Sequence, residues 1–280
     1  MEQEKLQEEL DEFKKHLVLQ HSLREITIKN HLGNIKRMLQ KIQTISPEKE
    51  EVTNYVYEIR SSDKSPSHMC NNISSIEKYM DFKKKLVRYA KPKRQQKIID
   101  SILTEGEINR MFYNCKDIKE KVMLLILAYS GIRNRSFCNL KVRDIDIGNN
   151  FIIVRKVKGR KEYTAYIPSE GIKIILGYLE KFPRKIEDYL FTTKIKGNQY
   201  SPSDIRKFLK VLAKRSNIEK RVYVHLLRHS LASNMLNRGA SIILIKNQLG
   251  HNWIQSTENY ISCFQPRIKS EFEVYKPAYL

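Results

Sequence analysis

Six residues after position 130 have side chains suited to transferring a phosphodiester without a metal ion. A guanidinium matches two oxygens of one phosphate, and a tyrosine hydroxyl can become a covalent acceptor that divides one hard step into two. Histidine and lysine can move protons near neutral pH. The six candidate catalytic residues are Arg133, Lys158, His225, Arg228, His251 and Tyr260.

The pair His225 and Arg228 is the most informative part of this set. Residues three apart share one face of a helix, so a single phosphate could contact both. The adjacent His229 points elsewhere, and we expect it to pack. The competing interpretation is a core histidine beside a surface arginine, because short His-x-x-Arg matches also occur by chance.

Glycine precedes two of the other candidates. Gly131 should end a helix over 121–130 just before Arg133, and Gly250 should end a helix over 241–249 just before His251. Tyr260 is one of 15 tyrosines, so composition alone does not distinguish it.

Lys158 lies in a basic turn between two expected strands. With Arg160 and Lys161 it could enter a DNA groove, whereas the simpler interpretation is an exposed hairpin tip.

The elements that must position these residues divide the chain into two parts. Amphipathic helices over about 2–20, 28–42, 47–60 and 66–80 predict an N-terminal bundle over 1–90. A basic link over 91–99 and an α+β domain over 100–280 follow. Short strands over 142–147, 151–157 and 162–167 predict one small antiparallel sheet. The expected fold class is mainly α with a small antiparallel sheet.

The charge of the chain indicates a polyanionic partner. Lys and Arg number 52 against 31 Asp and Glu, a net charge of +21. Anionic membranes or ribosomes could also attract such a protein. The densest basic run has no acidic residue, and it is either a solvated linker or a DNA contact: Lys83, Lys84, Lys85, Arg88, Lys91, Lys93, Arg94 and Lys97.

Cysteine spacing and hydropathy favour a protein that works inside the cell. The four cysteines match no metal or redox spacing, so we expect free thiols and no metal site. The longest apolar run, 122–128, is too short to cross a bilayer, and the acidic N-terminus is unlike a signal peptide. We expect a soluble, cytoplasmic protein with no membrane contact.

The order and spacing of the candidates resemble the tyrosine recombinase (integrase) family. Its members carry Thr-Gly-Leu-Arg, a hairpin with Gly-Lys-Gly, His-x-Leu-Arg-His-Ser/Thr, Leu-Gly-His and, nine residues later, a tyrosine. The matching segments here, in the same order, are 130–133, 157–159, 225–230 and 249–260. The N-terminal bundle is similar to the family's core-binding domain, and the layout is similar to its compact, Xer-like type.

This resemblance implies site-specific cutting and rejoining of double-stranded DNA through a 3′-phosphotyrosine at Tyr260. It implies no metal and no cofactor, and assembly of protomers into dimers and tetramers on DNA. An amphipathic stretch over 268–275 could pack on a neighbouring protomer or on its own. The chain starts almost directly with the bundle, so we expect no extra arm-binding domain.

Two positions depart from the family's pattern. Ser136 stands where an acidic residue is usual, and Val224 precedes His225 where proline is common. Neither change removes a catalytic group, although the first would weaken carboxylate support of Arg133.

Other functions remain open at this point. A catalytically silent DNA-binding regulator would be expected to lack Tyr260, Arg133 or Arg228, and all three are present. A type IB topoisomerase that nicks and reseals would use much the same residues. A basic RNA-binding protein would leave the ordered motifs unexplained.

Overall fold

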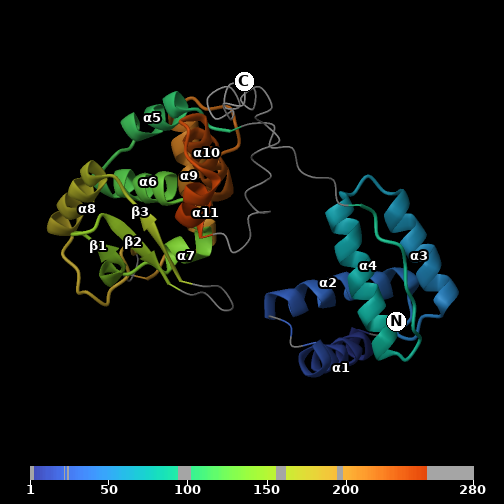
Figure 1. Cartoon of the computed structure of the whole chain (residues 1–280). Helices are drawn as coiled ribbons and strands as arrows, with labels where there is room; N and C mark the ends of the chain where they lie inside the picture. Colours follow the sequence, from blue (N-terminus) through green and yellow to red (C-terminus); the bar gives the residue numbers. More distant parts are fainter. Residues whose placement is uncertain are drawn as a thin grey trace, which may run out of the picture. The chain divides into compact units, whose positions relative to one another are not determined.

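The computed structural model describes residues 3–21, 23, 25–93, 102–155, 162–193 and 198–250. The chain divides into two compact units, Met1–Lys97 and Ile98–Leu280 (Figure 1). Helices dominate both units, and the second also contains a three-stranded antiparallel sheet. The predicted fold class is therefore confirmed.

The first unit is a bundle of amphipathic helices. Ser65 caps the last of them by accepting a hydrogen bond from the backbone N–H of His68, and Pro66 occupies its first turn, where no N–H is needed. The second helix begins at Glu25, three residues before the start predicted at residue 28. The helices are α1 (Gln3–His21), α2 (Glu25–Ile42), α3 (Lys49–Ser61) and α4 (Pro66–Phe82).

The core of this bundle includes one buried polar contact. Phe13 and Ile35 are fully buried, as is Tyr79. The hydroxyl of Tyr79 donates to the carboxylate of buried Glu9 at 2.7 Å, and the ammonium of Lys83 lies 3.1 Å from the same carboxylate. Because the buried charge has both partners, it does not carry the desolvation cost of an isolated ion.

The basic run after α4 lies against the bundle as far as Lys93, the last of its residues that the structure describes. Lys83, Lys85 and Lys91 form ion pairs with Glu9, Glu48 and Glu77 at 3.1, 2.6 and 2.7 Å. The Tyr89 hydroxyl also lies 3.1 Å from that of Thr53. The segment up to residue 93 is therefore part of the first unit, and three of its lysines are paired with the protein's own acids.

The second unit follows an order of helices, a small sheet and further helices. The helices before the sheet are α5 (Glu105–Tyr113), α6 (Ile118–Ser130), α7 (Asn134–Cys138) and the short 3-10 helix η1 (Val142–Asp144). The sheet contains β1 (Ile145–Asp146), β2 (Phe151–Val154) and β3 (Tyr163–Tyr166). After it come α8 (Ser169–Lys181), α9 (Pro202–Arg215), α10 (Val224–Asn237) and α11 (Ile242–Leu249).

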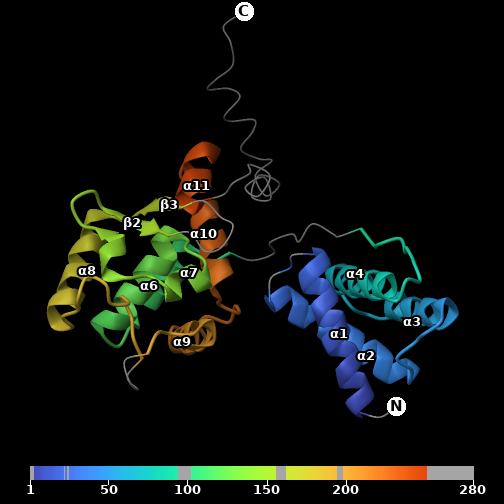
Figure 2. The ribbon, with the colours of Figure 1, turned by 90° about the horizontal axis from the view of Figure 1, so that it is seen from below.

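Helix α6 forms the centre of the second unit. Every residue from Val122 to Ala128 is buried, which explains why this stretch is apolar all round rather than on one stripe. Helices α5, α8 and α10 pack against it, and α11 lies beside both β3 and α10 (Figures 1 and 2). Helix α10, which carries His225 and Arg228, therefore packs directly on this central helix.

The strands are shorter than the sequence predicts. The strand expected over 142–147 begins only at Ile145, because Asp144 accepts a bond from the backbone N–H of Lys141 and closes a 3-10 turn. Strand order is β1-β2-β3, with Ile145 opposite Ile152 and Phe151 opposite Tyr166. The outer edge of β3 thus faces α11 rather than another strand.

Over the residues that the structure describes, none of the helices has the length and apolarity needed to cross a membrane.

Candidate functional site

The turn after α6 places Arg133. Gly131 ends the helix in the left-handed region at φ 55°, and Arg133 then forms the N-cap of α7. A methyl group on Gly131 would lie 2.5 Å from a Leu249 methyl, so only glycine permits this approach of α6 to α11. The sequence prediction that Gly131 stops the helix just before Arg133 therefore agrees with the structure.

Arg228 joins the ends of two helices. Its side chain is 2% exposed, and its Nη1 donates to the carbonyl oxygen of Gly131 while Nη2 donates to that of Leu249 at 2.5 Å. Both carbonyls lie at helix C-termini, where the backbone dipoles favour a cation. One guanidinium on α10 therefore fixes the chain just before Arg133 and just before His251.

His225 lies on the same helix as Arg228. It is exposed, one turn away on the first turn of α10, whereas Arg228 is buried. The arrangement is that expected for an i, i+3 pair, with the imidazole at the surface and the guanidinium beneath it.

His229 is half-buried, and its ring centroid lies 6.4 Å from that of His225. Burial, with smaller contributions from His225 and Arg228, lowers the pKa of His229 to about 4. This imidazole is therefore neutral at physiological pH, which agrees with the packing role expected for it.

The lowered pKa of His229 predicts a loss of stability in acid. Between the ordinary pKa of 6.5 and about 4, the unfolded chain binds the proton and the folded chain does not, so stability falls as pH falls. We expect urea unfolding of a His229→Gln variant to show a shallower pH dependence than the wild type between about pH 7 and 5. Equal slopes for the two proteins would contradict this assignment.

Gly250 lies directly against the ring of Tyr163. Its φ is 59°, and a methyl group there would come within 2.3 Å of the tyrosine ring. Tyr163 is the first residue of β3, so the end of α11 and the end of the predicted Lys158 hairpin are in contact. The same glycine that ends α11 also permits this close packing.

Gly250→Ala should therefore be strongly destabilising. An L-residue in the left-handed region and a methyl forced into a packed ring together cost about 2–4 kcal/mol. Thermal unfolding would measure this loss. Gly106→Ala in α5 is the matched control, since its nearest atom would be 3.9 Å away and its φ is ordinary. Equal melting temperatures for both variants would show that Gly250 is not constrained as described.

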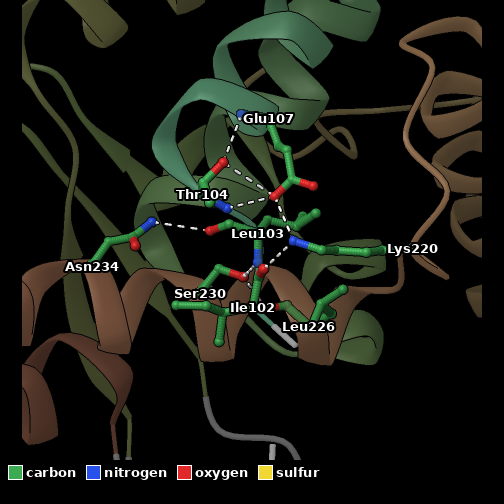
Figure 3. Close-up of polar contacts among 8 residues, drawn as sticks. All are labelled: Ile102, Leu103, Thr104, Glu107, Lys220, Leu226, Ser230 and Asn234. Carbon is green, nitrogen blue, oxygen red and sulfur yellow. Dashed lines mark hydrogen bonds and ion pairs between the residues drawn. The ribbon is translucent and has the colours of Figure 1, made fainter. Parts of the chain in front are cut away.

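The start of the second unit is held on and next to α10 by polar contacts that the sequence patterns did not reveal. Ser230 accepts from the backbone N–H of Leu103 at 2.8 Å, and Asn234 donates to its carbonyl at 3.3 Å. Lys220 donates to the carbonyl of Ile102 and to Glu107, each at 2.8 Å. Figure 3 shows Leu103 between Ser230 and Asn234. The incoming chain is thus attached to the helix that carries His225 and Arg228.

Ser230 is the last residue of the His225–Ser230 motif. Its hydrogen bond to the backbone of Leu103 explains why a hydroxyl is needed at this position of the motif. Its hydroxyl also donates to the carbonyl of Leu226 at 2.8 Å, so both of its hydrogen-bonding functions are used inside the protein. The serine in the motif therefore connects α10 to the segment that enters the unit.

Several candidates lie outside the described residues. Of the six candidate catalytic residues, the structure places Arg133, His225 and Arg228. Arg228 bonds to the helix ends that lead to Arg133 and to His251. On the near side of the predicted hairpin, Arg155 pairs with the buried carboxylate of Asp144 at 2.5 Å and holds the end of β2. The candidate catalytic and DNA-binding residues that lie outside the described part of the chain are Arg94, Lys97, Lys158, Arg160, Lys161, His251 and Tyr260.

The first unit contains a polar groove of about 670 Å³ between α2 and α4. Amide, imidazole, hydroxyl and cationic side chains line it, which are the groups that hydrogen-bond to base edges and phosphates. Asn34 is partly organised within it, donating to Ser75 at 2.9 Å and accepting from Arg37 at 2.6 Å. The lining includes Lys29, Asn30, His31, Asn34, Arg37, His68 and Asn71.

A cluster of two histidines and one carboxylate in this unit has the ligand types that could hold a metal ion. His16, His21 and Asp81 bring potential ligand atoms within 4.8 Å of one another. The ammonium of Lys78 lies 3.2 Å from Nδ1 of His21, and burial followed by this charge lowers the pKa of His21. A divalent cation would stand beside that ammonium, so we assign no metal site to the cluster.

Solved structures of DNA recombinases share this fold. The Tn1549 transposon integrase, solved in complex with transposon right end DNA, aligns with a TM-score of 0.70 at 17% identity, covering 96% of this chain and 99% of its own. The XerH site-specific recombinase bound to a palindromic difH substrate aligns with a TM-score of 0.67 at 16% identity, over 90% of this chain and 80% of its own. At these identities the likeness concerns the fold.

Sequence comparison identifies the family. The model described as the phage integrase family matches residues 101–265, more than half of the chain. The chain therefore belongs to the phage integrase family, and its class is that of the tyrosine-type site-specific recombinases.

Curated relatives extend this match over almost the whole chain. The tyrosine recombinase of Thermosipho africanus is 28% identical over 262 residues, covering 87% of this chain and 90% of the relative. The tyrosine recombinase XerA of Pyrococcus furiosus is 29% identical over 275 residues, covering 95% and 93%.

Proposed function

We propose that this recombinase cuts and rejoins double-stranded DNA through a covalent 3′-phosphotyrosine formed at Tyr260. The observation that carries the proposal is the position of Arg228. Its guanidinium binds the ends of α6 and α11 at once, so the segments leading to Arg133 and to His251 and Tyr260 start from one point. A phosphate site built from separate segments requires such a fixed junction.

Each candidate residue has one task in this reaction. Arg133 and Arg228 bind the non-bridging oxygens of the scissile phosphate and stabilise the charge that grows in the transition state. Lys158 protonates the leaving 5′ oxygen, and His225 assists removal of the proton from Tyr260. His251 donates a further hydrogen bond to the phosphate.

The reaction needs neither a nucleotide cofactor nor a metal ion for this chemistry. The tyrosyl oxygen forms a bond to phosphorus while the bond to the 5′ oxygen breaks, and the leaving oxygen takes a proton. One phosphate ester replaces another of similar energy, so the step is reversible. A 5′ hydroxyl from a partner duplex then attacks the phosphotyrosine and releases Tyr260. The same chemistry serves integration, excision and dimer resolution.

Double-stranded DNA is the proposed partner of both units. The first unit, which contains the proposed core-binding domain over 1–90, offers the polar groove between α2 and α4 to the duplex. The link over 91–99 and the catalytic domain over 100–280 are also rich in basic residues, and the whole chain has a net charge of +21, which favours binding to the phosphate backbone. The Tn1549 integrase, which shares the fold, was solved on DNA.

The basic side chains divide by their partners in the protein. Lys83, Lys85 and Lys91 are ion-paired with acids of the bundle, so phosphates would compete with those acids. We therefore expect Lys84, Arg88 and Lys93 to contribute more to DNA affinity than the three paired lysines.

Assembly on DNA completes the proposal. Protomers pair into dimers and tetramers, with the stretch over 268–275 packing on a neighbour, and the protein works in the cytoplasm. Deleting the residues after Arg267 should reduce assembly on DNA in gel-shift and light-scattering measurements. Unchanged assembly would contradict the role given to this tail.

Strand exchange between two DNAs tests the proposed function directly. Two labelled duplexes of different length that contain the target site are incubated with the protein, and products that join one label to the other are measured. Joined products support recombination. Relaxed or resealed DNA without joined products would instead indicate a topoisomerase, and tight salt-sensitive binding without cleavage a regulator.

A further inference from the structure

Gln248, the residue before Leu249 and Gly250, has a buried side chain whose amide bonds to two different elements. It is 7% exposed. Its Nε2 donates to the carbonyl oxygens of Tyr129 and Tyr166 at 2.8 and 2.9 Å, and its Oε1 accepts from the backbone N–H of Tyr166 at 3.0 Å. Both amide hydrogens and the amide oxygen are thus used.

The two bonds to Tyr166 complete the edge of the sheet. Among the strands that the structure describes, the order β1-β2-β3 leaves the outer edge of β3 without a strand partner. The backbone N–H of Ile167 bonds inward to the carbonyl of Asn150 at 2.8 Å, whereas the polar groups of Tyr166 point outward. The Gln248 amide pairs with them as a neighbouring strand would, which satisfies groups that are costly to leave unpaired.

The third bond attaches the same side chain to α6. Tyr129 lies two residues before Gly131, whose carbonyl accepts from Arg228. Gly250 packs on the ring of Tyr163 at the other end of β3. The last turn of α11 is therefore held against α6, α10 and both ends of β3, next to the point where the chain leaves toward His251.

We propose that Gln248 is a positioning residue for the strand-cleavage step, acting by fixing the α11 end from which His251 and Tyr260 follow. This inference rests on the proposed function for its catalytic consequence. It goes beyond that function because Gln248 touches no reacting atom and belongs to none of the motif positions that carry the chemistry.

Only a primary amide of this length can make all three bonds. A leucine fills the space but leaves the polar groups of Tyr166 and the carbonyl of Tyr129 without their partner. A glutamate keeps the acceptor for the Tyr166 N–H but directs a negative charge at two carbonyl oxygens. Protonation of that glutamate would restore one donor, and burial raises the pKa of a carboxyl, so acid should partly restore the geometry.

The test compares Gln248→Leu and Gln248→Glu with Asn247→Ala, an exposed position on the same helix. Single-turnover formation of the covalent adduct is measured at saturating DNA, separately from DNA affinity and well below the melting temperature. Displacement of reacting groups by about 1 Å costs about 100-fold in rate, so we expect the Leu variant to lose about 10–100-fold while affinity and the control are unchanged. The Glu variant should recover relative to wild type as pH falls.

Hydrogen exchange at the Tyr166 amide gives a readout that does not depend on activity. Faster exchange there in the Leu variant, with the rest of the unit unchanged, supports the role of Gln248 in fixing the end of α11. This result would hold even if the wild type forms no covalent adduct with DNA. Absence of the wild-type adduct would overturn the proposed function alone. Unchanged exchange at Tyr166, or an adduct rate equal to that of the control, would overturn the role of Gln248. If the Leu variant does not fold, the pH profile of the Glu variant decides, and a flat profile overturns the role.

Discussion

Tyr260→Phe should abolish the covalent protein–DNA adduct while DNA affinity changes by less than about twofold, because binding rests on contacts with the phosphate backbone. The substitution removes only the oxygen that we propose as the nucleophile. Without it no ester to the 3′ end can form, and the remaining residues have no phosphotyrosine to act on. The measurement is SDS-resistant complex formed on nicked duplexes, in which the cut strand cannot be rejoined.

The matched control for this prediction is Tyr113→Phe. Tyr113 is 90% exposed at the end of α5, so the same chemical change there should leave the adduct at its wild-type level. An adduct that persists in Tyr260→Phe, with the control behaving as wild type, would assign the nucleophile to another residue.

Arg228→Lys should lose both activity and stability. A lysine keeps the charge but presents it from one nitrogen, so it cannot bond to Gly131 and Leu249 in the fixed fork of a guanidinium. Leaving a buried carbonyl without its donor costs about 1–3 kcal/mol. Losing one preorganised donor to the transition state lowers the rate by about 10²–10³-fold.

The two effects of Arg228→Lys can be separated. Urea unfolding gives the stability, and adduct formation at a temperature where the variant is folded gives the rate. Arg221→Lys, at an exposed position just before α10, is the control and should behave as wild type. Wild-type stability in Arg228→Lys would refute the junction between the helix ends, and a wild-type rate would refute the catalytic role.

The sequence predicted the helix ends around the site better than the contacts between them. Gly131 and Gly250 were recognisable as helix stops because glycine accepts the left-handed backbone that a C-cap requires. The meeting of both ends at Arg228 depends on tertiary packing, which leaves no periodic signal in the sequence. The hydrogen bonds of Gln248, Ser230 and Asn234 were missed for the same reason, although Ser230 itself belongs to the recognised motif.

Local patterns also gave two results that the structure modifies. Val142 belongs to a 3-10 turn rather than a strand, because the side chain of Asp144 competes for the backbone N–H of Lys141. For the basic run after α4, the sequence revealed the positive charge but not the acidic partners of its lysines. The partners of Lys85 and Lys91, Glu48 and Glu77, lie in other parts of the chain, so the packing of this segment on the bundle could not be predicted.

The structure gives a physical reason why separated motifs must act together. The turn before Arg133, the helix with His225 and Arg228, and the end of α11 are connected by one buried guanidinium and by the Gln248 amide. Disturbing any one connection should therefore affect groups supplied by another element. This coupling predicts that the effects of changes at Arg228 and Gln248 on the cleavage rate will not be additive.

Mapping the residue that becomes attached to DNA is the measurement that tests the central claim most directly. The wild-type protein is trapped on nicked duplexes, digested with protease and nuclease, and the nucleotide-bearing peptide is sequenced by mass spectrometry. The account predicts one modified residue, Tyr260, joined to the 3′ end of the cut strand, with a free 5′ hydroxyl on the other side. A nucleotide on any other residue, or attachment through a 5′ phosphate, would contradict it.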